Sequence, residues 1–158
     1  MGHGSRFIVE LPLEPDDAEA APAAPVAAPV KTTSRGRRIL VIEDNEDAAL
    51  TTKLILERWG HRVELQREGR DALEAARRLA PELVLCDIGL PGDMDGYAVA
   101  RAMRADQQLR SIYLIALTGY GTDEDKSLAL RAGFDVHMTK PLSAEALMSA
   151  VASAPTPD

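Results

Sequence analysis

From Arg37 onward, the chain alternates short apolar runs with longer amphipathic stretches, without a break. The short runs are rich in aliphatic and β-branched residues, as in buried strands, whereas the longer stretches carry apolar residues at helical spacing and end near Gly or Pro. Strands are predicted at 37–44, 61–66, 82–87, 111–119 and 135–139, and helices at 48–60, 70–81, 95–105, 122–133 and 143–153. Strands that alternate with helices in this way predict an α/β fold, a parallel sheet covered by helices on both faces.

Two of the predicted helices carry additional local signals. In the first, Leu50, Leu54 and Trp59 recur at helical spacing. In the fourth, Thr122 and Asp125 stand three residues apart, the spacing of a capping box at a helix N-terminus. These signals favour helices at both places over further strands.

Polar residues stand where four of the five predicted strands end. In chain order they are Glu43 and Asp44, Asp87, Thr118, and Lys140. Because the carboxyl ends of parallel strands share one edge of a sheet, we expect these side chains to converge. Three carboxylates in contact repel one another unless a cation intervenes, and Mg²⁺ prefers oxygen ligands. With a lysine and a hydroxyl opposite them, such acids suit the transfer of a phosphoryl group to a carboxylate.

Charge and composition exclude several classes of function. The net charge of −7 disfavours non-specific binding to nucleic acid or to an anionic membrane, so we expect no nucleic-acid partner. No apolar run approaches the roughly 18 residues of a membrane span, and no direct membrane insertion is expected. The single cysteine, Cys86, rules out an internal disulfide and favours a reducing, cytoplasmic location.

The N-terminal part has a different composition. Residues 14–36 are dominated by Ala, Pro and acids near their start, and they predict a flexible linker with nothing large to bury. Residues 1–13 contain a strand-like alternation of Phe7, Val9 and Leu11. The first five residues have the alternative interpretation of an expression remnant. After the alternating region, we expect residues 154–158 to form a disordered tail.

The segments that carry the polar strand ends resemble the receiver domains of two-component signalling. "VIEDN" resembles the acidic pocket of that family, "LCDIGLPGDMDGY" its phosphoacceptor loop, and "ALTG" and "MTKP" its switch hydroxyl and its lysine followed by proline. The resemblance covers about residues 37–153. It implies a single flavodoxin-like, doubly wound (βα)5 domain with a five-stranded parallel sheet. It also implies a phosphoacceptor that promotes only its own phosphorylation and dephosphorylation.

The resemblance assigns a role to each acid. Asp87 takes the position of the phosphoacceptor. Glu43, Asp44 and Asp87 would hold Mg²⁺ as the cofactor, with the backbone carbonyl of Gly89 as a further ligand. We expect Asp44 to be the direct ligand of the acid pair and Glu43 to act through water, because Mg²⁺ usually keeps several waters.

The resemblance also implies a conformational switch. Thr118 would turn toward the acyl phosphate, Lys140 would bind it, and the bond before Pro141 is usually cis in this family. The family often has an aromatic switch residue three positions before the lysine, where this chain has His137. His137 has two interpretations: it is a modified, pH-dependent switch residue, or it only occupies space in its strand.

The chain departs from the family pattern around the phosphoacceptor. The loop after Asp87 is one residue longer than usual, which leaves the start of the third helix open. Gly89 and Tyr120 stand two residues beyond Asp87 and Thr118, at positions that tune the lifetime of the acyl phosphate in this family. The lifetime therefore does not follow from the resemblance.

The first residues carry a second, shorter resemblance. "GHGSRFIVELPL" resembles the last strand of the ATP-binding domain of sensor histidine kinases. A hybrid histidine kinase has this order: the end of a kinase domain, then a linker, then a receiver domain. Such a protein would be tethered to a membrane through a sensor part that precedes these residues. The expected partners are a histidine kinase phosphotransfer domain, in cis or in trans, and a histidine phosphotransfer protein. A monomer or a weak dimer is expected.

Three alternatives remain. A flavodoxin-like cofactor binder would share the topology, but its first loop should be rich in Gly, Ser or Thr, whereas this loop is "EDNED". An aspartyl-phosphate phosphatase normally has a second acid two residues after its nucleophile, where this chain has Gly89. A non-catalytic docking module would have lost an acid or the lysine, and none is lost.

Overall fold

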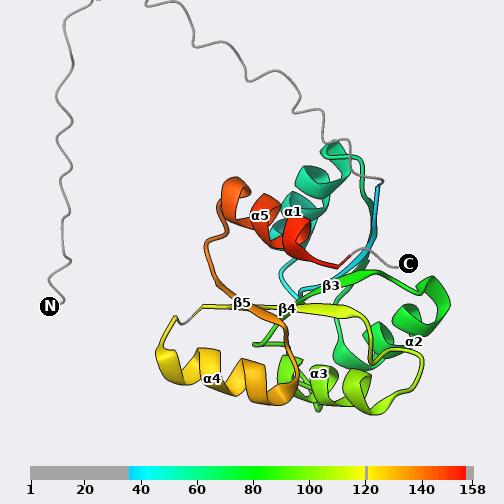
Figure 1. Cartoon of the computed structure of the whole chain (residues 1–158), viewed down its shortest axis with the longest axis vertical. Coiled ribbons are helices and arrows are strands. Elements are labelled where there is room, and N and C mark those ends of the chain that lie inside the picture. Colours follow the sequence, from blue (N-terminus) through cyan, green and yellow to red (C-terminus); the bar gives the residue numbers. More distant parts are fainter. Residues whose placement is uncertain (1–35, 120, 156–158) are drawn as a thin grey trace, which may run out of the picture. The chain divides into compact units, whose positions relative to one another are not determined.

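The computed structural model describes residues 36–119 and 121–155. Within these residues, five strands form one parallel sheet, and helices alternate with them (Figure 1). The strands are β1 (Arg38–Ile42), β2 (Arg62–Gln66), β3 (Leu83–Asp87), β4 (Tyr113–Thr118) and β5 (Val136–Thr139). The helices are α1 (Glu46–Arg58), α2 (Gly69–Leu79), α3 (Gly96–Ala105), α4 (Asp123–Ala132) and α5 (Ala144–Ser153). The flavodoxin-like (βα)5 fold expected from the sequence is confirmed.

The order of the strands determines where a site forms. The sheet has the order β2-β1-β3-β4-β5. β2 therefore lies on one side of β1, and β3, β4 and β5 follow on the other side, so the strand order reverses between β1 and β3. Ligands of such sheets bind beyond the carboxyl ends of the strands at this reversal. In the register of β1 and β3, Ile42 stands opposite Cys86. The next residue on each strand is an acid, Glu43 and Asp87, so both acids lie at the reversal.

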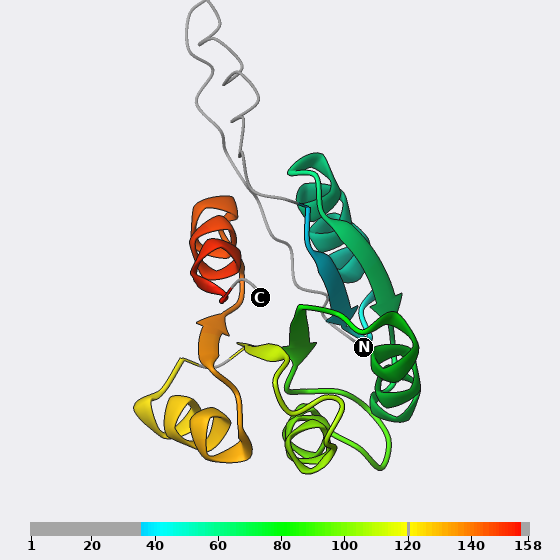
Figure 2. The ribbon, with the colours of Figure 1, turned by 45° about the vertical axis from the view of Figure 1, so that its right-hand side comes forward.

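Alternate residues of the central strands face opposite layers of helices. Ile39 and Val41 of β1 belong to a buried cluster with α1 and α5, whereas Leu40 and Ile42 belong to a cluster with α2, α3 and α4. Figures 1 and 2 show these two layers on either side of the sheet. The central strands are buried on both faces, which explains why they are continuous apolar runs instead of alternating ones.

Side-chain caps account for the helix boundaries. Asn45 accepts a hydrogen bond from the amide of Ala48, so α1 begins two residues earlier than predicted. Asp95 caps α3, which places the helix start that the longer loop had left open. The capping box predicted at Thr122 and Asp125 is present at the start of α4.

The rotation of α1 differs from what its apolar spacing suggested. Leu50 and Leu54 are 48% and 59% exposed, whereas Ala49 and Leu56 are buried against the sheet. The prediction of a helix is correct, but the leucine stripe that supported it faces outward. The buried residues of α1 are Ala49 and Leu56, so the spacing of Leu50 and Leu54 indicated a helix but not its buried side.

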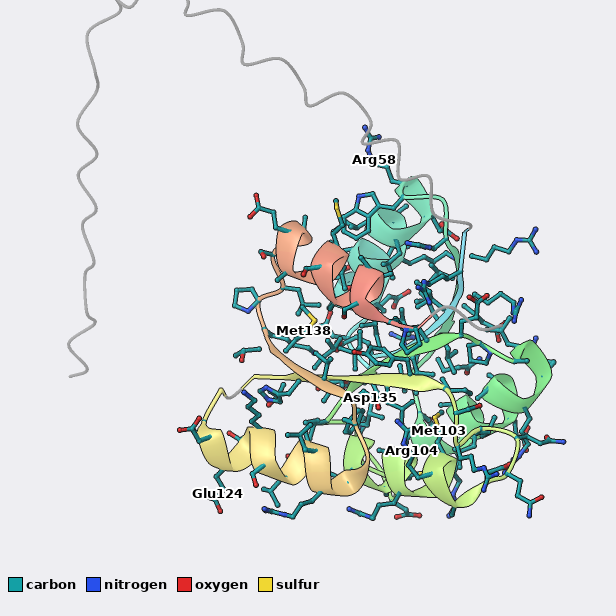
Figure 3. The ribbon with its side chains drawn as sticks, viewed as in Figure 1. Arg58, Met103, Arg104, Glu124, Asp135 and Met138 are labelled. Atoms are coloured by element: carbon teal, nitrogen blue, oxygen red, sulfur yellow. The ribbon has the colours of Figure 1, made fainter. Side chains whose placement is uncertain are left out.

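Arg104, near the end of α3, fastens the end of α4 to the start of β5 (Figure 3). Its Nε donates to the carbonyl of Gly133, and its Nη2 donates to Asp135 Oδ2, each at 2.8 Å. Its Nη1 donates to the carbonyls of Arg110 and Ile112, also at 2.8 Å. The C-terminal end of α4 is therefore anchored by these hydrogen bonds, whereas residues 119–122 connect its N-terminal end to β4.

The folded unit extends beyond the predicted end at residue 153. Ala154 is buried, and the guanidinium of Arg37 donates to the carbonyls of Ala154 and Pro155 at 2.7 and 2.8 Å. The first two residues of the expected tail therefore pack against the domain, because Arg37 caps the end of α5. The predicted strand remnant at 1–13 and almost all of the linker at 14–36 lie outside the described residues. Among those that are described, no helix is long and apolar enough to cross a membrane.

Candidate functional site

The three acids predicted to converge do meet at the carboxyl edge of the sheet. One carboxylate oxygen from each of Glu43, Asp44 and Asp87 lies within 4.8 Å of the others. Glu43 is only 3% exposed and Asp87 is also buried, whereas Asp44 is open to solvent. The group thus has two buried acids on adjacent strands and one acid at its open side.

Lys140 joins the two buried acids. Its Nζ donates to Glu43 Oε2 at 2.5 Å and to Asp87 Oδ2 at 2.8 Å. The lysine follows β5, two strands away from β3, so only the folded sheet brings these three side chains together. The ammonium supplies the opposite charge that two buried carboxylates in contact require.

Burial and the neighbouring charges shift the pKa values of Glu43 and Lys140. Burial raises the pKa of Glu43 and the charge of Asp87 adds to the rise, against the opposing effect of Lys140. Burial by itself lowers the pKa of Lys140, but its hydrogen bonds to Asp87 and Glu43 outweigh burial and the net change is upward. Lys140 therefore stays protonated, while Glu43 holds its proton to a higher pH than an exposed glutamate does.

Backbone groups fix the orientation of Asp87. The amide of Gly89 donates to Asp87 Oδ1 at 3.0 Å, and a Cβ placed on Gly89 would lie 3.7 Å from the same oxygen. The start of α3 packs closely below, since a Cβ on Gly96 would lie 2.3 Å from the carbonyl oxygen of Asp87. Glycine is required at the second position, whereas at the first it leaves space open beside the carboxylate.

Among the other predicted residues, the structure describes Thr118, His137 and Pro141. Thr118 is buried at the end of β4, and its carbonyl accepts a hydrogen bond from the amide of Lys140 at 2.7 Å. The peptide bond between Lys140 and Pro141 is cis, the isomer that the resemblance implied. His137 lies on β5, and its buried Nε2 has no hydrogen-bond partner among the residues that the structure describes. Tyr120 lies outside those residues.

The donor set fits a hard divalent cation. All the side-chain ligands are carboxylate oxygens, as Mg²⁺ prefers, and exposed Asp44 leaves room for water in the coordination sphere. Each of the two buried acids already has a hydrogen bond from Lys140. A cation bound there would share these two carboxylates with the ammonium.

Sequence reasoning missed a groove that opens beside the acids. It has a volume of about 440 Å³ and lies between α1 and the loop that leads into α5. Its walls include Ile55, Leu142 and Leu147, which in the sequence resemble ordinary core residues, while Glu43 and Lys140 form part of its lining. No sequence signal marks such a groove, because it depends on the distance between two helices far apart in the chain.

Comparison with known proteins agrees with this geometry. The profile of the response regulator receiver domain family matches residues 39–152. The chain is 36% identical over 109 residues to the transcriptional regulatory protein AfsQ1 of Streptomyces coelicolor, covering 69% of this chain and 47% of that protein. It is 34% identical over 122 residues to the sensor protein GacS of Pseudomonas syringae pv. syringae, covering 75% of this chain and 13% of that protein.

A solved structure extends the comparison to the cleft. The receiver domain of the sensor histidine kinase PA1611 from Pseudomonas aeruginosa is 31% identical, with a TM-score of 0.70 over 76% of this chain and 98% of that one. It was solved with a magnesium ion coordinated in its active-site cleft.

The chain belongs to the response regulator receiver domain family. It is a phosphoacceptor module of two-component phosphorelays, and such modules are generally not enzymes. Receiver domains in general interact with histidine kinases or phosphotransfer proteins. The chain spans less than half the length of AfsQ1 and a small part of the length of GacS.

Proposed function

We propose that Asp87 accepts a phosphoryl group from a phosphohistidine. The observation that carries this proposal is the pair of contacts from Lys140 Nζ to Asp87 and Glu43 at the end of the sheet. An ammonium held there can neutralise an oxygen of the transferring phosphoryl group. The amide of Gly89 orients the Asp87 carboxylate, but buried Glu43 likewise accepts from Lys140 and from the amide of Asn45. Asp87 is favoured as the nucleophile because it takes the phosphoacceptor position in the family resemblance and because Gly89 leaves space open beside its carboxylate.

Three acids and one backbone carbonyl would hold Mg²⁺: Glu43, Asp44 and Asp87, with Gly89 as the fourth ligand. A bound Mg²⁺ neutralises charge on phosphoryl oxygens. The spacing of the carboxylate oxygens supports this assignment. Exposed Asp44 suits direct coordination, and buried Glu43, already bonded to Lys140 and to the amide of Asn45, suits an indirect role through water.

Phosphorylation would be reported through the start of α4. The Thr118 hydroxyl would turn toward the phosphoryl group, and the loop 119–122 would follow it to the N-terminal end of α4. Arg104 anchors the C-terminal end of α4 through hydrogen bonds to Gly133 and Asp135, which supports movement at the N-terminal end in particular. His137 would respond to the space that Thr118 leaves. Gly89 and Tyr120 would set how long the acyl phosphate lasts.

A hybrid histidine kinase is the proposed parent protein. Its support is the order of a kinase-like segment at 1–13, a linker at 14–36 and the receiver, together with similarity to the sensor protein GacS. The phosphoryl donor would be the kinase's own phosphotransfer domain or one in a second chain, and a histidine phosphotransfer protein would be the acceptor. The receiver would work in the cytoplasm as a monomer or weak dimer, without its own ATP-dependent activity.

Phosphoramidate tests the proposal, because its P–N bond mimics that of phosphohistidine. Incubated with Mg²⁺, the full chain should gain the mass of one phosphoryl group, and removal of Mg²⁺ with a chelator should prevent the gain. Asp87→Asn should abolish it, whereas Asp93→Asn, at an exposed acid of the same loop, should not. An undiminished gain in Asp87→Asn would overturn the proposal.

A further inference from the structure

The two ends of α4 are held against their neighbours in different ways. At the C-terminal end, the guanidinium of Arg104 anchors the helix through hydrogen bonds. At the N-terminal end, Gly121 directly precedes the helix cap Thr122 and lies against Thr139 of β5. A Cβ placed on Gly121 would lie 2.9 Å from Thr139 Oγ1 and 3.3 Å from its Cγ2. Because van der Waals contacts are individually weaker than hydrogen bonds to a charged group, the N-terminal end is the one that is more easily released.

Thr139 lies on the side of Thr118 that faces away from the phosphoacceptor. The two threonines stand opposite each other in the register of β4 and β5. β3, which ends at Asp87, lies on the other side of β4. A movement of the start of α4 toward Asp87 therefore carries Gly121 away from Thr139.

The side chain of Thr139 faces the layer of α4 without being part of the core. Its neighbour Met138 belongs to the buried cluster with α1 and α5, and successive side chains of a strand point to opposite faces of the sheet. Thr139 itself is exposed. A substitution at this position should thus change the contact with Gly121 and leave the buried clusters intact.

We infer that Thr139 is a positioning residue whose side chain holds the N-terminal end of α4 against β5 and so opposes the movement of α4 that follows phosphorylation. This inference rests on the proposed function, in which that movement begins at Thr118. The contact exists when Gly121 lies beside β5 and is lost when Gly121 moves toward β3, so Thr139 stabilises only the first of the two positions. A side chain that stabilises one of two conformations shifts their populations.

The contact depends on the shape of the Thr139 side chain. Oγ1 and Cγ2 both approach Gly121, and the two heavy atoms on Cβ restrict the χ1 angle. Valine has the same shape without the hydroxyl, so Thr139→Val should keep the contact, whereas Thr139→Ala should remove it. Gly121→Ala adds a methyl group where Thr139 Oγ1 leaves too little space, so it should destabilise the position beside β5.

Titration of the full chain with beryllofluoride, a phosphoryl mimic, measures in the presence of Mg²⁺ how readily α4 moves. The amide shifts of residues 123–126, in the first turn of α4, give the apparent affinity. Thr139→Ala should bind beryllofluoride about fivefold more tightly, because the position beside β5 has lost a stabilising contact. Thr139→Val should stay within about twofold of the wild type, below the usual size of a coupling effect.

A second measurement needs neither Mg²⁺ nor a phosphoryl mimic. In Thr139→Ala by itself, the amide shifts of residues 123–126 should already be displaced from the wild-type values toward the beryllofluoride-bound values. The shifts at the end of α4 that Arg104 anchors should not be displaced. If Thr139→Ala lowers the midpoint of thermal denaturation without displacing the shifts of residues 123–126, Thr139 has only a structural role and the inference is wrong.

The double variant assigns the effect to this contact. Gly121→Ala should tighten the binding of beryllofluoride in the wild-type background but not in the Thr139→Ala background, where the nearest remaining side-chain atom, Cβ, would lie 3.7 Å from the added methyl group. Additive effects would mean that the two residues act independently, which overturns the inference. Binding that is unchanged or weaker in Thr139→Ala, or a Thr139→Val that behaves like Thr139→Ala, would overturn it too. Absence of beryllofluoride binding in the wild type would instead contradict the proposed function.

Discussion

Replacing Lys140 with methionine should strengthen the binding of Mg²⁺. Methionine keeps the length of the side chain and removes its charge. In the structure, the Lys140 ammonium contacts Glu43 and Asp87, two of the three acids of the proposed metal site, at 2.5 and 2.8 Å. A cation bound there must compete with this ammonium for the charge of the same two carboxylates, and the variant removes the competitor.

The magnitude follows from the two hydrogen bonds. A hydrogen bond to a charged group contributes about 1.5–3 kcal/mol. The displaced ammonium recovers part of this from water, because the Lys140 side chain is 28% exposed. We therefore expect a net gain of about 1–2 kcal/mol in Mg²⁺ binding, or roughly five- to thirtyfold in the dissociation constant.

In the absence of Mg²⁺, Lys140→Met should lower the stability of the fold. Without Lys140, two buried acids lie in contact with no counter-charge, so the free energy of unfolding should fall. Calorimetric titration with Mg²⁺ is done at about pH 8, because a high pH favours the ionised form of Glu43, whose pKa burial raises. Thermal denaturation with and without Mg²⁺ gives the second measurement, and the stabilisation by Mg²⁺ should be larger in the variant than in the wild type.

Lys126→Met is the control, since Lys126 is an exposed lysine of α4. It removes the same charge away from the acids and should leave the affinity almost unchanged. The reasoning is refuted if Lys140→Met binds Mg²⁺ no more tightly than the wild type, or more weakly. The lysine would then assist the metal instead of competing with it.

Three further predictions concern other titratable groups. Burial raises the pKa of Glu43, so its ionisation opposes folding as the pH rises through that pKa. In urea denaturation at neutral pH without metal, Glu43→Gln should therefore be at least as stable as the wild type. Burial and the charge of Arg37 lower the pKa of His61, whose Nδ1 accepts a hydrogen bond from the Arg37 amide, so stability should fall as the pH drops through about 6.5. His61→Gln should flatten this loss in urea denaturation, and an unchanged slope would count against it. His137→Tyr should change the beryllofluoride-induced amide shifts of residues 119–126, because His137 lies on β5 with a buried Nε2 that has no hydrogen-bond partner among the described residues. Unchanged shifts would mean that His137 only occupies space in its strand.

Much of the fold was predictable because its signals are local. The apolar runs that became β1, β3 and β4 lie between polar segments, and the capping box of Thr122 and Asp125 marks the start of α4. The convergence of Glu43, Asp87 and Lys140 was predictable too, because parallel strands place their carboxyl ends at one edge. Each of these predictions needs only the chain's own periodicity and the geometry of a parallel sheet.

Features that depend on packing between distant segments were not predictable. The exposure of Leu50 and Leu54 depends on how α1 is turned against the sheet, which the spacing of these two leucines does not encode. The packing of Ala154 involves a hydrogen bond from Arg37, which stands near the start of the domain's sequence. The bridge from Lys140 to both acids could be predicted as proximity, but not as two simultaneous hydrogen bonds.

The chemical identity of the phosphorylated residue tests the central claim most directly. After incubation with Mg²⁺ and phosphoramidate, hydroxylamine converts an aspartyl phosphate to a hydroxamate, and peptide mass spectrometry then locates the modified residue. We expect one modified residue, Asp87 at the end of β3, and no modification when the phosphodonor is omitted. A hydroxamate on Glu43 or Asp44 instead, or a phosphoryl group that resists hydroxylamine, would contradict it.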